Sequence, residues 1–120
     1  MSKIANNVYD ILKELFPNNR IKKEHYVNFR GTRLFFDFYM PDFGLFVEVQ
    51  GEQHDKYVKH FHSSKEQFLE SKKRDNLKIA YVQGSEWLDL IRINHNEDVT
   101  TELVYDKINK ALTEKEGYYG

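Results

Sequence analysis

The sequence predicts a single α/β domain with the element order α-β-β-β-α-β-α and a central mixed sheet flanked by helices. Two dense apolar runs, LFFDFYM (residues 34–40) and LFVEVQ (residues 45–50), are separated only by the turn PDFG (residues 41–44) and predict a β-hairpin. Apolar residues recur at helical intervals near both ends of the chain and again after residue 64. The 120 residues, 40% of them hydrophobic, contain no repeat or linker and therefore predict one domain, residues 1–120.

The first half of the chain predicts a helix followed by three strands. A helical stripe of apolar residues ends at Pro17 and comprises Ile4, Val8, Ile11, Leu12 and Leu15. Residues 21–29 predict a strand, and residues 30–33 predict a turn into the hairpin. Glu48 and Gln50 alternate with Leu45, Val47 and Val49, which predicts two distinct faces for the second hairpin strand.

The second half predicts a helix, a strand and a helix. A polar stretch follows Gly51, and Ser63 or Ser64 is expected to cap a helix that runs to about Tyr81, with Phe68, Leu69, Leu77 and Ala80 on its apolar side. Gly84 is expected to close this helix, and residues 86–94, including Trp87, predict a strand. Residues 99–112 predict an amphipathic helix, and the tail from residue 114 is expected to be frayed.

Composition narrows the classes of function. The absence of cysteine excludes disulfide scaffolds and thiolate metal sites and fits a protein of a reducing cytoplasm. No run is long enough for a membrane span. The net charge of -1 does not by itself indicate a nucleic-acid partner, and the local basic clusters are also explained by a solvated surface.

The hairpin places two carboxylates opposite each other. If residues 41–44 form the loop, Met40 pairs with Leu45, and Asp37 then lies opposite Glu48. Directly opposed like charges repel, so two acids in such apolar strands need a bridging proton or cation. Oxygen donors favour Mg²⁺ or Mn²⁺. Plain solvation of this face is the competing interpretation, and Phe35, Tyr39 and Phe46, which we expect on the same face, argue against it.

The segment FDFYMPDFGLFVEVQGEQHD resembles the core of the PD-(D/E)xK, or restriction-endonuclease-like, nuclease superfamily, in which an acid on one strand precedes (D/E)-x-(K/Q) on the next. With the later KRDNL and LDLIRI, it is most similar to the branch of very-short-patch-repair and EDxHD homing endonucleases, over residues 29–93. The resemblance implies a restriction-endonuclease-like fold and Mg²⁺-dependent (or Mn²⁺-dependent) hydrolysis of DNA phosphodiester bonds.

Residue by residue, the resemblance implies that Asp37, Glu48 and the backbone carbonyl of Val49 bind the metal. Gln50 stands where the family usually has Lys, so another group must supply proton transfer or charge. His54 is the candidate general base, with Asp55 orienting it or adding a ligand.

Outside the hairpin, the resemblance suggests further contributors. Lys72, Arg74 and Lys78 are the candidate DNA-binding residues, with Lys78 contacting phosphate. Asp75 and Lys78 match the family's RD-x-x-(K/R) pattern but could equally form an ordinary surface pair on one helix. Glu14 is the match for a glutamate that the N-terminal helix of this branch contributes, and an ordinary exposed glutamate explains it as well.

Two other functions remain open from the sequence. The histidines His54, His60 and His62 could bind zinc, although histidines in a polar loop are more often solvated. The absence of Lys at position 50 also fits a nuclease-like domain that only binds nucleic acid or a protein. For an enzyme of this size we expect nicking or structure-specific cleavage, as a monomer, a homodimer or part of a larger nuclease assembly.

Overall fold

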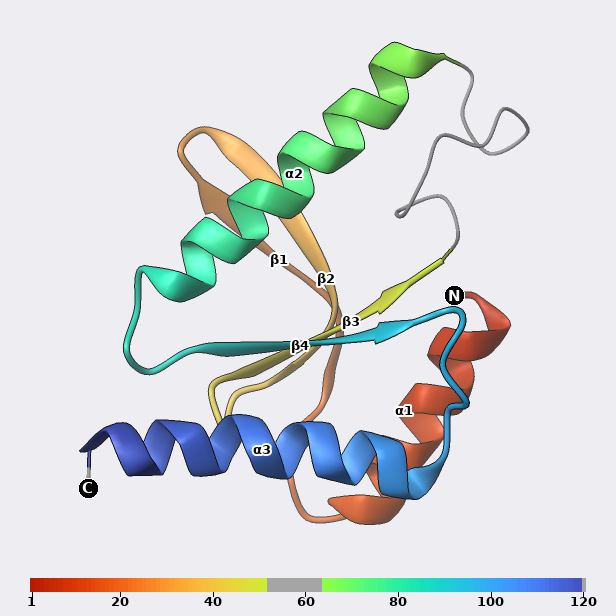
Figure 1. Cartoon of the computed structure of the whole chain (residues 1–120), viewed down its shortest axis with the longest axis vertical. Helices are drawn as coiled ribbons and strands as arrows, with labels where there is room; N and C mark the ends of the chain where they lie inside the picture. Colours follow the sequence, from red (N-terminus) through yellow and green to blue (C-terminus); the bar gives the residue numbers. More distant parts are fainter. Residues whose placement is uncertain (52–63, 120) are drawn as a thin grey trace.

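The computed structural model describes residues 1–51 and 64–119, with side chains up to Glu114. Its elements follow the predicted order: α1 (Lys3–Leu15), β1 (Lys22–Phe29), β2 (Thr32–Met40), β3 (Leu45–Gln50), α2 (Lys65–Gln83), β4 (Asp89–Asn94) and α3 (Thr101–Tyr119). The protein is therefore an α/β domain with a four-stranded mixed sheet and three helices (Figure 1). None of the helices among the described residues is both long and apolar enough to cross a membrane.

The sheet has the strand order β1-β2-β3-β4, antiparallel except for the parallel pair β3–β4. The predicted register of the hairpin is confirmed, because Met40 pairs with Leu45 and Phe38 with Val47. Gly44 adopts a φ of 61° in the connecting turn, a backbone conformation that glycine takes without steric cost. The parallel strand β4 is reached through α2, the crossover that parallel neighbours require.

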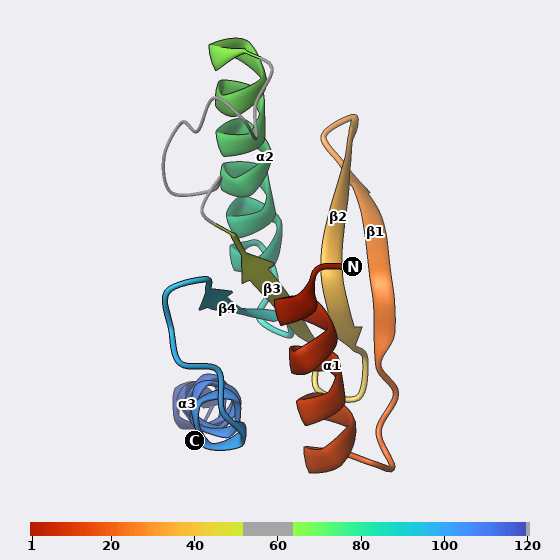
Figure 2. The same cartoon turned by 90° about the vertical axis from the view of Figure 1, so that its right-hand side faces the viewer.

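Helices cover the two faces of the sheet unequally. The larger cluster packs α1 and α3 against β2, β3 and β4, and its fully buried members include Leu12, Phe38, Val47, Ile93 and Ile108. The smaller cluster lies beneath α2 and contains Leu34, Phe36, Phe46 and Val82. Figure 2 shows α2 apart from the other two helices, beside the outer part of the β1–β2 hairpin.

The β1–β2 hairpin is irregular at the level of Glu24 and Asp37. Phe36 and Tyr39 are three residues apart, so a regular strand would point them to opposite faces, yet both pack into the cluster beneath α2. The β1–β2 register includes the pairs Lys23–Phe38 and His25–Phe36 but omits the pair between them, Glu24 and Asp37. Glu24 also has a φ of 51°, which a non-glycine residue seldom adopts. Both strands are thus kinked beside Asp37.

Several predicted details are wrong, each for a local reason. Phe35 is 52% exposed, because the kink turns it away from the α2 face on which Tyr39 and Phe46 lie. Leu69 is 63% exposed, since α2 extends beyond the sheet (Figure 1). Trp87 precedes β4 and is 71% exposed. The tail expected to fray continues α3 to Tyr119, because one interior glycine among good helix formers weakens a helix without ending it.

Candidate functional site

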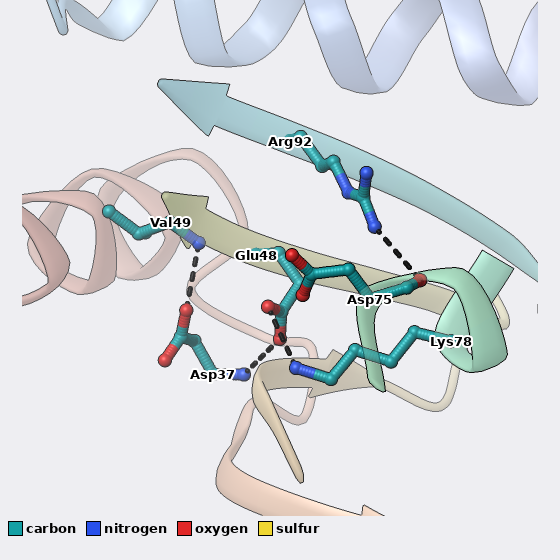
Figure 3. A network of polar contacts seen from close by, with 6 residues as sticks. All are labelled: Asp37, Glu48, Val49, Asp75, Lys78 and Arg92. Carbon is teal, nitrogen blue, oxygen red and sulfur yellow. Dashed lines mark hydrogen bonds and ion pairs between the residues drawn. The ribbon is translucent and has the colours of Figure 1, made fainter. Parts of the chain in front are cut away.

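The site lies where β2 and β3 separate. Their backbone pairing ends at the pair Phe38–Val47. Beyond this pair, the side-chain carboxylates of Asp37 and Glu48 connect the two strands. The backbone N–H of Asp37 donates to Glu48 Oε1 at 3.0 Å, and the backbone N–H of Val49 donates to Asp37 Oδ2 at 2.8 Å (Figure 3). The two acids therefore meet as the hairpin register predicts, with one oxygen of each held by a backbone amide.

Glu48 is buried, with only 4% of its surface exposed, and this rules out the solvated-face interpretation for this residue. Gln50 on the same strand face is also buried, as alternation predicts. A buried carboxylate needs hydrogen bonds or an opposite charge to offset the loss of hydration. Glu48 has both, because its second oxygen, Oε2, accepts from the ammonium of Lys78 at 3.1 Å.

Lys78 reaches Glu48 from the middle of α2, 30 residues later in the chain. Its side chain is 11% exposed, and its ammonium lies 5.4 Å from the centre of the Phe36 ring. The sequence suggested a phosphate contact or a surface pair with Asp75. In the structure Lys78 is the buried counter-charge of Glu48, which brings a lysine to the site although position 50 is Gln. Its contact with phosphate stays a prediction.

Asp75 and Arg92 extend the polar group beneath α2 (Figure 3). Asp75 is 7% exposed, which argues against the alternative of an ordinary surface pair. Arg92 lies beside Glu48 in the parallel register and donates from Nη2 to the backbone carbonyl of Asp75 at 3.4 Å. This contact ties β4 to α2 one helical turn before Lys78.

The charges around Glu48 act in opposite directions. Burial raises the pKa of Glu48 above its ordinary value; the Lys78 ammonium opposes that rise, and the charge of Asp37 adds to it. A cation bound between the acids would favour the ionised form of Glu48, as Lys78 does.

A pocket of about 730 Å³ opens onto these residues. Its walls include Asp37, Glu48, Val49 and Lys78, together with Glu24 from β1 and the first residues of α1. Gln50 is not among the residues that line it, and Glu14 lies exposed on the last turn of α1, at the other end of that helix. Glu24 was not predicted as a site residue, because its place in the pocket beside the two acids depends on the kink in β1.

A second pocket, of about 640 Å³, adjoins the first and shares Phe35 and Lys78 with it. Arg74, a predicted DNA-binding residue, lines this pocket, and so do Lys73 and Arg33. Lys72 does not, and its ammonium instead lies 5.7 Å from the Phe68 ring centre.

The predicted catalytic pair His54 and Asp55 lies outside the described residues, as do His60 and His62 of the zinc alternative. Within the part of the chain that the structure describes, no group of three or more His, Cys, Asp or Glu side chains is placed to hold a metal. Where β2 and β3 separate, the carboxylate oxygens of Asp37 and Glu48 are the oxygen donors that meet. These hard oxygen donors fit Mg²⁺, which keeps several waters and commonly takes only one or two carboxylates from a protein.

Comparisons with known proteins leave the family open. No family model and no solved structure matches the chain. Among curated proteins, "Uncharacterized protein 307L" of Invertebrate iridescent virus 6 is 47% identical over 73 residues. That match covers 60% of this chain but only 36% of the viral protein. The chain is thus similar to part of a longer viral protein whose name assigns it no activity.

Proposed function

We propose that this chain is a metal-dependent endonuclease of the restriction-endonuclease-like PD-(D/E)xK superfamily that hydrolyses DNA phosphodiester bonds. The observation that carries the proposal is the meeting of Asp37, Glu48 and Lys78 in one pocket, from β2, β3 and α2. The family to which the sequence is similar uses two acids and a lysine, and here the nearby lysine comes from α2, while position 50, where the family usually has the lysine, is Gln.

Each residue has a distinct role in the proposed mechanism. Asp37, Glu48 and the carbonyl of Val49 would hold Mg²⁺ or Mn²⁺, which supplies charge neutralisation at the phosphate and lowers the pKa of water. The amides of Asp37 and Val49 fix one oxygen of each acid, so the carboxylates are oriented before a cation binds. Lys78 opposes the rise in the pKa of Glu48 that burial causes, and it would place a positive charge where a phosphate oxygen enters the pocket.

Asp37→Asn tests the proposal, because it removes the charge while keeping an oxygen that can accept from Val49. We expect cleavage of supercoiled, single-stranded and branched DNA under Mg²⁺ or Mn²⁺ to fall by about 100- to 1,000-fold. The thermal stabilisation by Mg²⁺ should disappear with it. Asp106→Asn on the exposed side of α3 is the matched control and should change neither.

Unchanged cleavage in Asp37→Asn would contradict this site assignment. Tight DNA binding by the wild-type protein without cleavage in either metal would instead favour the alternative, a nuclease-like domain that only binds.

A further inference from the structure

The two adjoining pockets form one groove around an open edge of β2. Within residues 1–51 and 64–119, residues 32–36 pair with β1 on one side only, because the pairing with β3 begins at Phe38. Phe35 and Lys78 belong to both pockets, so the groove passes from the surface of α2, over this edge, to the acids.

The two ends of the groove have opposite charge. Of the residues that the structure describes, the end beside α2 holds three cations besides Lys78, namely Arg33, Lys73 and Arg74, and one acid, Glu70. The other end holds Glu24, Asp37 and Glu48. A polyanion is attracted to the first end and repelled from the second unless a cation neutralises the acids there. This polarity fits a phosphate chain that lies along α2 and reaches the acids together with a metal.

An exposed aromatic pair stands between the two ends. Phe35 is paired across the strands with Tyr26, their ring centres are 5.7 Å apart, and about half of each side chain is exposed. The guanidinium of Arg33 lies 5.0 Å from the centre of the Tyr26 ring. Aromatic rings beside cations are the arrangement on which unpaired bases stack, since a base offers its π-face only when it is free of its duplex neighbours.

We propose that the groove binds an unpaired stretch of nucleic acid, with its phosphates against Arg33, Lys73 and Arg74 and a base stacked on Phe35. This inference rests on the proposed function and names its substrate class: a single strand, or a single-stranded segment at a junction or flap, in preference to a continuous duplex.

The test measures binding of the full-length protein in EDTA, where metal-dependent cleavage cannot interfere. The probes are a fluorescent 20-residue DNA single strand, the RNA single strand of the same sequence and the corresponding DNA duplex. Phe35→Ala should weaken binding of the single strand about tenfold and of the duplex less than twofold. Phe35→Trp should restore single-strand binding, and Tyr105→Ala, an exposed aromatic on α3, should leave it unchanged. The DNA and RNA arms report which strand is preferred.

Salt dependence tests the charged end separately. Lys73→Gln should lower the slope of log affinity against log salt by about 0.7 for the single strand, whereas Lys110→Gln on α3 should leave the slope unchanged.

Two results would overturn the inference: a Phe35→Ala affinity for the single strand within twofold of wild type, or equal losses of affinity for the single strand and the duplex. The outcome is independent of catalysis. If Phe35→Ala selectively loses single-strand binding but the wild type cleaves nothing, the groove stands and the proposed activity fails. If cleavage depends on Asp37 but neither cleavage nor single-strand binding depends on Phe35, the proposed activity stands and the inference about the groove fails.

Discussion

The two faces of the sheet bury different kinds of side chain. The cluster beneath α1 and α3 is apolar throughout its buried members. The face beneath α2 combines a small apolar cluster with the buried polar residues Glu48, Gln50 and Asp75. Hydrophobic burial contributes most to stability, whereas buried charges are costly unless they are paired. The protein thus gathers its buried polar and charged side chains under α2 and buries most of its apolar side chains on the opposite face of the sheet.

Two matched leucines test this division directly. Leu12 on α1 and Leu34 on β2 are both fully buried, one in each cluster. We expect Leu12→Ala and Leu34→Ala each to lower the free energy of unfolding by about 2–5 kcal/mol in urea titrations. Only Leu34→Ala should also weaken Mg²⁺ binding and cleavage per folded molecule, because it loosens the packing beneath α2. Equal losses of Mg²⁺ binding in both variants would show that the two faces are not separate.

The pair of Glu48 and Lys78 offers a finer test. Removing one partner leaves a buried charge, so we expect Glu48→Gln and Lys78→Met each to cost about 3 kcal/mol of unfolding free energy. The double variant should be within about 1 kcal/mol of wild type, because it leaves no unpaired charge. Urea titration of the four proteins gives the coupling energy.

The more exposed pair of Glu97 and Lys107, at 3.0 Å, is the control for this cycle, and its coupling should stay below about 1 kcal/mol. Strictly additive single variants at Glu48 and Lys78 would mean that their contact contributes nothing to stability.

The smallest expected effect is a dependence of stability on pH. Folding raises the pKa of Glu48, so between the ordinary value of 4.5 and the raised value the folded protein binds more protons than the unfolded chain. Stability of the metal-free protein should therefore fall as pH rises through this window, by at most about 1.4 kcal/mol per pH unit from this group.

Comparison with a variant that lacks the titrating carboxyl isolates the contribution of Glu48 to the pH dependence. The double variant Glu48→Gln, Lys78→Met lacks the titrating group but keeps every other acid, so the difference between its unfolding free energy and that of wild type should change across the window. A constant difference would mean that Glu48 titrates alike in the folded and unfolded chains.

Local patterns were enough to predict the elements and half of the site. The turn length fixed the hairpin register, and with it the meeting of Asp37 and Glu48, because both acids lie within one local hairpin. The ion pair of Lys78 with Glu48 spans 30 residues and depends on how α2 crosses the sheet, which helical periodicity does not encode. Glu24 and Phe35 owe their positions to a kink that no turn residue announces, since neither Glu24 nor Asp37 is a glycine or a proline. The roles predicted for His54 and Asp55 stay predictions.

The kink also gives the two acids unequal mechanical support. Glu48 belongs to an inner strand whose backbone is paired with Arg92 of β4, and the ladder to β2 begins at the preceding residue. Asp37 lies where backbone pairing lapses on both sides, and the hydrogen bonds to Glu48 and Val49 secure it instead. Asp37 therefore has less backbone support than Glu48, and we expect a substitution of Glu24 in β1 to change the distance between the acids by moving Asp37, while the pairing of β3 with β4 keeps Glu48 in place.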